Sequence, residues 1–175
     1  MMVYPWYELI TRSEIILQGD FVPECPIIIP PTNFEVEVPE VEVQLIDAII
    51  MSQSCDLVNS KAEIALVAPY VSLKYFLDSM PEVTTHKAKN KIIETLRKGH
   101  MPGYHLLNKW DKYLQDYQVV DFSNVYGINV EALKNKCKEI EHLRLLPPYR
   151  EHLSQAFARY FMRVGLPQDL IIEGY

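Results

Sequence analysis

The chain has 175 residues, of which 49% are hydrophobic, and this is enough for one domain with a substantial core. Its formal net charge of -6 disfavours binding to duplex nucleic acid by bulk attraction, because such binding needs many Lys and Arg contacts to phosphates. The three cysteines form no closely spaced disulfide set, and the N-terminus lacks the order of a signal peptide. No apolar run approaches the roughly 20 residues that span a bilayer, so we expect a cytoplasmic protein without a membrane segment.

The first part of the chain predicts short extended segments separated by turns. Gln18-Gly19-Asp20-Phe21 is a turn signal, in which Gly19 permits a positive φ. Prolines surround residues 27–29, which are therefore expected to form at most a short strand or an edge strand. Residues 34–45 alternate in polarity and change parity at Pro39, which predicts two half-buried strand pieces joined by a bend. The glutamates in this stretch predict a solvated face rather than a metal site: Glu35, Glu37, Glu40 and Glu42.

A central strand is predicted over residues 47–54, where an apolar run ends in small polar side chains. Residues 57–61 have the composition of a hairpin turn, and residues 62–69 predict a second apolar strand. Several short strands at this spacing indicate a small barrel or a strongly curved sheet.

Residues 71–114 depart from the strand pattern and predict a helical insert. Leu73, Phe76 and Leu77 fit one helical turn, and an amphipathic helix follows that ends at Gly99. This second helix carries the basic cluster of an acidic chain: Lys87, Lys89, Lys91, Arg97 and Lys98. The cluster is either an ordinary solvated face or a contact surface for RNA, single-stranded DNA or an acidic partner.

The C-terminal part predicts a strand and two helices. Residues 117–122 read as the strand, and Asn129 as the cap of a helix that places Cys137 in the core. The last helix begins at Pro147-Pro148 and is expected to end at Gly165-Leu166-Pro167. Its predicted buried face packs on the sheet and comprises Leu153, Ala156, Phe157, Tyr160, Phe161 and Val164.

The polar side chains after the central strand form the candidate site, together with those of the earlier turn: Gln18, Asp20, Gln53, Ser54, Cys55 and Asp56. None of the histidines stands in a recognised relation to Cys55, so a buried structural cysteine is favoured over a nucleophile. Asp20 and Asp56 are candidates for holding magnesium, or for accepting hydrogen bonds from their own turns. No Cys-x-x-Cys or His-x-x-x-His pair is present, so neither a metal nor a cofactor is predicted.

Two further residues complete the candidate set. His105 lies in a stretch rich in Gly and Pro that is predicted to be a loop, where a histidine is either functional or simply surface. Arg150 stands in the first turn of the last helix, where the helix dipole disfavours positive charge, so we expect it to have an acidic partner such as Asp56.

Two segments together resemble uncharacterised bacterial proteins of mobile and phage-defence gene clusters. They are Met51-Ser-Gln-Ser-Cys-Asp-Leu57, which follows Gln18-Gly-Asp20, and the terminal residues 148–167. The resemblance covers most of the chain outside the insert and implies no known activity.

A more distant likeness is to toxins of the PemK and MazF type, which are small SH3-like barrels with a Gly-Asp near the first strand. Gly19-Asp20 and the strands at residues 48–52 and 64–69 stand in a similar order. Those toxins cut RNA with an arginine before the middle strand and a Ser or Thr after the next, where this chain has Asp47 and Tyr70. The likeness therefore implies the fold rather than the ribonuclease chemistry.

The sequence thus predicts a single α+β domain over residues 1–175, with a small curved antiparallel sheet or SH3-like barrel, a helical insert at about residues 71–114 and a packed C-terminal helix. The leading functional hypothesis is a binding or regulatory subunit of a bacterial defence or toxin-antitoxin system. Its partner would be a protein encoded nearby, or RNA or single-stranded DNA. The alternative is a hydrolase, in particular a nuclease, with a site around Asp20, Cys55 and Asp56.

Overall fold

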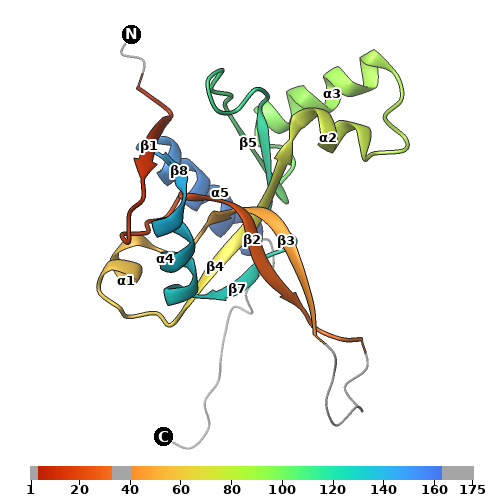
Figure 1. The fold of residues 1–175 in the computed structure, drawn as a ribbon. Helices are drawn as coiled ribbons and strands as arrows, with labels where there is room; N and C mark the ends of the chain where they lie inside the picture. Colours follow the sequence, from red (N-terminus) through yellow and green to blue (C-terminus); the bar gives the residue numbers. More distant parts are fainter. Residues whose placement is uncertain (1–3, 33–40, 163–175) are drawn as a thin grey trace, which may run out of the picture.

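The computed structural model describes residues 4–32 and 41–162, and over these ranges the chain is an α+β fold (Figure 1). Each strand pairs with its neighbours in antiparallel fashion. In these two ranges no helix is both long enough and apolar enough to cross a membrane.

The main sheet has the strand order β2-β3-β4-β6-β5, and β7 pairs with β4 off this path. Its strands are β2 (Phe21–Ile29), β3 (Glu42–Ile50), β4 (Ile64–Ser72), β5 (Tyr104–Leu107), β6 (Gln118–Asp121) and β7 (Tyr126–Asn129). A second sheet consists of β1 (Tyr7–Thr11) and β8 (Glu141–Leu145). Because the path begins at β2 and ends at β5, pairing among the described strands leaves the sheet open.

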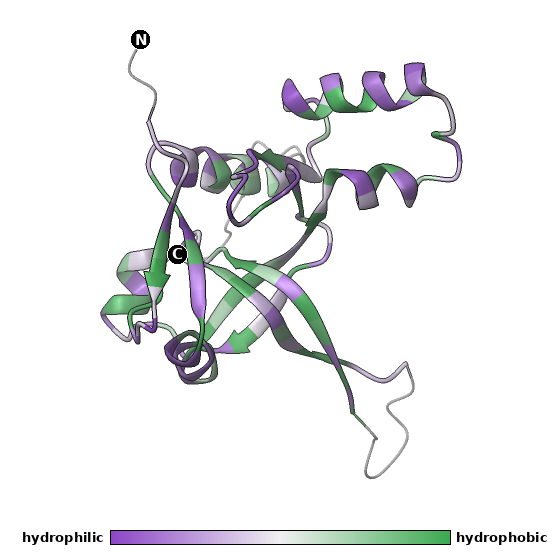
Figure 2. Ribbon diagram, turned by 45° about the horizontal axis from the view of Figure 1, so that its top comes forward, coloured by the Kyte–Doolittle hydropathy of each residue, from purple (hydrophilic) through white to green (hydrophobic). Residues whose placement is uncertain are grey.

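The helices are α1 (Ser54–Val58), α2 (Leu73–Asp78), α3 (His86–Arg97), α4 (Val130–Glu139) and α5 (Tyr149–Phe161). The predicted cap of α4 is confirmed, because Asn129 Oδ1 accepts the backbone N–H of Glu131 at 2.9 Å and of Ala132 at 3.2 Å. Helices α2 and α3 project away from the rest of the molecule, and the β2–β3 pair projects in another direction (Figures 1 and 2).

The core is divided among three groups of buried side chains. The first lies between β2, β3, β4 and α4 and includes Cys25, Ile27, Leu133 and Cys137, so the predicted burial of Cys137 is confirmed. The second joins α5 to the sheet through Leu153, Phe21, Leu145 and Phe122, as expected for the last helix. The third holds α2 and α3 together and reaches β6 through Val119.

Residues 27–29 belong to an edge strand, as expected, but β2 is nine residues long rather than short. An edge strand tolerates Pro23 and Pro26 because its outer N–H groups need no partner strand. The pairing with β3 shifts register between Val22 and Cys25, where Glu24 has a φ of 48°.

The prediction of a hairpin turn at residues 57–61 is wrong. The helix α1 fills part of this interval because Leu57 is buried in the first core group. Strands β3 and β4 are still antiparallel neighbours, with Ala48 opposite Pro69. The interval 71–114 is likewise not wholly helical, since β5 lies inside it and pairs with β6.

The last helix is buried on one face but differs from prediction near its end. Phe161 is 60% exposed, because the sheet is already covered by Leu153 and Phe157, and its ring lies 5.0 Å from those of Phe157 and Tyr160. Val164, the predicted helix end at residues 165–167 and the bend at Pro39 lie outside the described residues.

Candidate functional site

A cleft of about 360 Å³ between α1 and α5 gathers most of the predicted site residues. Its lining consists of Gln18, Gln53, Ser54, Cys55, Arg150, Glu151, Ser154 and Gln155. The loop before β2 contributes Gln18. Gln53 immediately precedes α1, and Ser54 and Cys55 begin that helix. The other four lining residues belong to the first turns of α5. We call this hollow the α1–α5 cleft.

Hydrogen bonds hold the floor of the α1–α5 cleft in place. The buried Gln18 side chain donates from Nε2 to the carbonyl of Met51 at 2.7 Å, and its backbone N–H donates to Ser54 Oγ at 3.1 Å. Ser154 Oγ accepts from Gln53 Nε2 at 3.3 Å. Gly19 follows Gln18 with a φ of 86°, and a side chain there would meet Leu145 Cβ at 3.0 Å, so this turn requires glycine.

The prediction that Cys55 is buried is wrong, because its thiol is exposed at the cleft. Helix α1 turns Leu57 into the core, and Cys55, two residues earlier, faces outward. Cys55 Sγ lies 3.6 Å from Asp56 Oδ1, and no histidine belongs to the lining. Asp56 is half-buried, lies outside the lining, and its backbone carbonyl accepts the N–H of Lys61 at 2.9 Å.

The expected acidic partner of Arg150 is present, but it is Glu151 rather than Asp56: Arg150 Nη2 lies 2.8 Å from Glu151 Oε1. The Glu151 carboxylate offsets the unfavourable helix dipole at Arg150. Burial opposes ionisation of Glu151, but hydrogen bonds from Arg150 and from its own backbone outweigh it and lower the pKa of this carboxyl.

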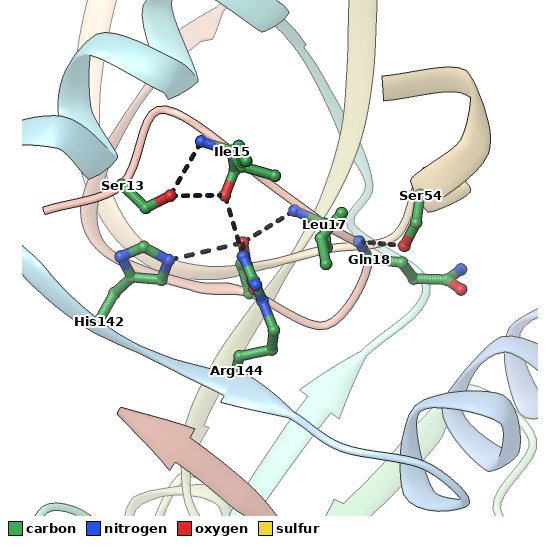
Figure 3. A network of polar contacts seen from close by, with 8 residues as sticks. Ser13, Ile15, Leu17, Gln18, Ser54, His142 and Arg144 are labelled. Atoms are coloured by element: carbon green, nitrogen blue, oxygen red, sulfur yellow. Dashed lines mark hydrogen bonds and ion pairs between the residues drawn. The ribbon is translucent and has the colours of Figure 1, made fainter. Parts of the chain in front are cut away.

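Asp20 is separated from the α1–α5 cleft and has a structural role. Its side chain is fully buried and accepts hydrogen bonds from Arg144 Nε at 2.6 Å, Arg144 Nη2 at 2.8 Å and the backbone N–H of Leu17 at 2.8 Å. Arg144 and His142 reach from β8 toward the loop before β2 (Figure 3), and His142 Nε2 lies 3.5 Å from Asp20 Oδ2. Of the two roles considered for Asp20, magnesium ligand or acceptor of hydrogen bonds from its own turn, the structure supports the second, because the Leu17 N–H lies in that turn.

A second hollow, the basic groove, lies between the end of α3, β5 and α5 and has a volume of about 520 Å³. Its lining comprises Arg97, Lys98, Gly99, Met101, Pro102, Tyr104, His105, His152, Gln155, Ala156 and Arg159. None of these described lining residues is acidic. Gln155 lines both hollows, so the groove and the α1–α5 cleft adjoin along α5.

His105 lies in this groove on β5, whereas the sequence predicted a loop. Its ring stacks near Phe122, with centroids 6.3 Å apart. Burial, with smaller contributions from His152 and Arg159, lowers the pKa of His105 to about 4. The imidazole is consequently neutral at pH 7.

The predicted basic cluster on α3 is only partly available for a partner. Lys89 Nζ pairs with Asp78 at 2.6 Å, and Arg97 pairs with Glu94 at 2.9 Å. Lys87, Lys91 and Lys98 are exposed and show no ion pair with a described residue. Of these three lysines, Lys98 lines the basic groove, whereas Lys87 and Lys91 lie outside it. The predicted cluster is therefore not one continuous contact surface.

Sequence reasoning missed the polar face of α5. Glu151, Ser154, Gln155 and Arg159 follow Arg150 at helical spacing, opposite the apolar residues that were used to predict the buried face. That spacing was the available signal. In the part of the chain that the structure describes, no group of three or more His, Cys, Asp or Glu side chains has an arrangement that could hold a metal ion.

The chain matches no protein-family model, and no curated protein is significantly similar to it. The α1–α5 cleft offers amides, hydroxyls, a thiol and the Arg150–Glu151 pair, whereas the basic groove offers cations suited to a polar, anionic ligand.

Proposed function

We propose that this protein is a non-catalytic binding component that holds single-stranded nucleic acid in the basic groove beside α5. The observation that carries the proposal is the charge of the groove. The groove is lined by Arg97, Lys98, His152 and Arg159, and none of its described lining residues is a carboxylate. This is notable because the whole chain has a net charge of -6. A local basic groove attracts phosphate even where the net charge of the protein is negative.

The shape and the neighbouring groups support a single strand over a duplex. A hollow of about 520 Å³ with few cations admits a few nucleotides, whereas a duplex requires a long basic face. Tyr104 offers a half-buried ring on which a base can stack. Gln53 and Gln155 in the adjoining cleft offer amides that pair with exposed base edges.

The biological setting of this proposal rests on the sequence resemblance. We propose a regulatory subunit of a bacterial defence or toxin-antitoxin system, acting in the cytoplasm with a protein partner encoded nearby. Kinship with the SH3-like barrel of PemK and MazF toxins belongs to the same proposal. Asp47 and Tyr70 replace the arginine and hydroxyl of those toxins and supply neither cation nor aliphatic hydroxyl, which supports binding without RNA cleavage.

One observation favours a second candidate, a hydrolase that uses Cys55. The exposed thiol shares the α1–α5 cleft with Arg150 and Glu151. A cysteine nucleophile needs a base in reach, and the ionised Glu151 is already bonded to Arg150. We therefore rank this alternative second.

Fluorescence anisotropy with labelled oligouridine RNA and oligothymidine DNA tests the proposal. We expect binding to both, and a loss of about tenfold or more in affinity for Arg159→Glu and for Lys98→Glu, because each exchanges a phosphate-attracting charge for a repelling one. Lys61→Glu is the matched control, since Lys61 is exposed, lies between α1 and β4 and lines neither hollow.

The same samples separate binding from catalysis. The RNA should remain intact on a denaturing gel after incubation with protein and Mg²⁺. Affinity that is equal in Arg159→Glu, Lys98→Glu and the control would contradict the groove. Cleavage that disappears in Cys55→Ala would instead establish the hydrolase alternative.

A further inference from the structure

The outward face of the β2–β3 pair is apolar where a sheet normally turns polar side chains to solvent. In the strand register Ile28 lies opposite Val43, and Pro26 lies opposite Leu45. Ile28 is 62% exposed, Val43 60% and Leu45 65%. We call these residues the apolar stripe.

The opposite face of the same strands is already buried in the core. Cys25 and Ile27 lie in the first core group, with 0% and 1% exposure. Strands that are apolar on both faces are typical of sheets covered on both sides. Figure 2 shows that no described element covers the projecting end of this pair. The apolar stripe therefore has the character of a contact surface for another molecule.

The stripe leads into a hollow whose charge is opposite to that of the basic groove. Alternate residues of a strand share a face, so Asp47 continues the face of Val43 and Leu45. Asp47 lines a hollow of about 610 Å³ with Tyr70, Val71, Ser72, Tyr75, Tyr113, Leu114, Gln115, Asp116 and Gln118. None of these described residues is basic. We call this hollow the acidic tyrosine groove.

The carboxylates of the acidic tyrosine groove are held in place. Asp47 Oδ1 accepts the backbone N–H of Glu24 at 3.0 Å, and Asp116 accepts those of Lys74 and Tyr117, both at 2.8 Å. Burial, and then the neighbouring Asp47, raise the pKa of the Tyr70 phenol, which therefore remains a hydrogen-bond donor. These fixed acids face solvent without an ion pair to a described residue.

The tyrosines add a preference for cations. Tyr75 is 65% exposed, and the exposed Lys112 already places its Nζ 4.9 Å from the centroid of Tyr113. Tyrosine faces attract guanidinium and ammonium groups, and carboxylates accept paired hydrogen bonds from arginine. The exposed Glu24, whose backbone N–H binds Asp47, adds a further negative charge beside the acidic tyrosine groove.

We propose that the apolar stripe and the acidic tyrosine groove together bind a protein partner through a segment that presents apolar side chains next to Arg or Lys. The stripe supplies buried area, and the groove supplies a receptor for the cation, so the two features select one chemistry. This site uses elements and a charge different from those of the nucleic-acid groove, and it stands or falls independently of the function proposed above.

Synthetic peptides provide the probe, because the partner is unidentified. The peptides share one set of Leu, Val and Ile residues and differ in carrying two Arg, two Glu or two Ser. We expect the Arg peptide to bind, with amide chemical-shift changes in ¹⁵N-labelled protein at Leu45, Asp47, Tyr70 and Tyr75. The Glu peptide should not bind, because its charge repels both the groove and its rim.

Substitutions then separate the two parts of the site. Asp47→Asn keeps an acceptor for the Glu24 N–H but removes the charge, and it should weaken binding of the Arg peptide about tenfold. Leu45→Ser should weaken binding of the Arg and Ser peptides alike, because it reduces the apolar contact. Glu139→Gln on the exposed face of α4 is the control for loss of one negative charge.

Two results would overturn the proposal. One is equal binding of the Arg and Glu peptides, or shift changes confined to other elements, in the wild-type protein. The other is sedimentation that shows a dimer dissociated by Leu45→Ser, since a second copy of this chain would then cover the stripe.

Discussion

Asp20 and Arg144 form an ion pair inside the protein that fastens the loop before β2 to β8. Asp20 is fully buried, and the Arg144 side chain is 13% exposed. Replacing Asp20 by Asn leaves the guanidinium in the same place without a compensating charge. We expect a loss of about 3 to 5 kcal/mol in the free energy of unfolding, measured by chemical denaturation.

The comparison variants show whether burial is the cause. Glu131→Gln breaks the exposed pair between Glu131 and Lys134, and it should leave the melting temperature nearly unchanged. Arg144→Met in the Asp20→Asn background should recover part of the loss, because no isolated charge then remains. A small effect of Asp20→Asn would mean that solvent reaches this pair.

The cysteines predict a simple pattern of chemical modification. Cys55 is exposed, whereas burial raises the pKa of Cys25 to about 11 and that of Cys137 to about 12. Iodoacetamide should therefore modify Cys55 first in the folded protein, and Cys25 and Cys137 only after unfolding, as followed by mass spectrometry of peptides. Cys55→Ser should abolish the fast reaction, and early labelling of Cys137 would contradict the described core.

His105 predicts a dependence of stability on pH. Its pKa is about 4 in the folded protein and lies near 6.5 in the unfolded chain. Between these values the unfolded chain binds the proton more strongly, so the free energy of unfolding falls as pH is lowered from 6.5 to 4. The fall should be smaller in His105→Asn than in the wild type.

The exposed His100 supplies the control for this pH experiment. Denaturant melts at closely spaced pH values should give the same slope for His100→Asn as for the wild type. Parallel profiles for His105→Asn and the wild type would show that His105 is protonated equally in both states.

Helix α5 serves both the core and the surface: one face packs on the sheet, and the other lines the α1–α5 cleft and the basic groove. Leu153 is fully buried beside Leu145 and Phe21, so Leu153→Ala should cost about 2 to 5 kcal/mol in the free energy of unfolding. Phe161→Ala should change stability little, because that ring is 60% exposed. Equal costs at both positions, measured by thermal melts, would contradict the described orientation.

Periodicity predicted α3, α4 and α5 well because each carries an apolar face at helical spacing, and α3 and α4 also have a local side-chain cap. The cap at Asn129 needs only its own helix. The exposure of Cys55 could not be predicted in this way. It follows from the packing of Leu57 between β2, β4 and α4, and the local sequence carries no information on that packing.

The candidate site was predictable to a similar extent. Gln18, Gln53, Ser54, Cys55 and Arg150 were chosen as polar residues next to turns and a helix start, and the fold brings them to one cleft. In the sequence Asp20 resembles these site residues, because it also follows a turn. Its partner Arg144 is more than a hundred residues away, so only the tertiary structure shows that Asp20 forms an ion pair instead of binding a ligand.

At the scale of the whole molecule, the charges are sorted onto separate surfaces. The lining of the basic groove holds cations and no carboxylate, and that of the acidic tyrosine groove holds carboxylates and no cation, among the residues that the structure describes. In an acidic protein, this arrangement favours the approach of a polyanion with the basic groove facing it.

This sorting predicts the salt dependence of RNA binding. A single strand contributes about -0.7 to the slope of log affinity against log salt concentration for each phosphate neutralised. Contacts from Lys98 and Arg159, with part of Arg97, should therefore give a slope of about -1.4 to -2. Arg159→Glu should make the slope less negative by about 0.7, because one phosphate contact is lost.

Lys61→Glu changes the net charge equally but removes no contact, so it should reduce affinity slightly at low salt and leave the slope almost unchanged. Titrations of labelled oligouridine over a range of salt concentrations measure both quantities. If Arg159→Glu and Lys61→Glu shift the slope alike, net charge rather than the groove governs the interaction, and the strand has no fixed place beside α5.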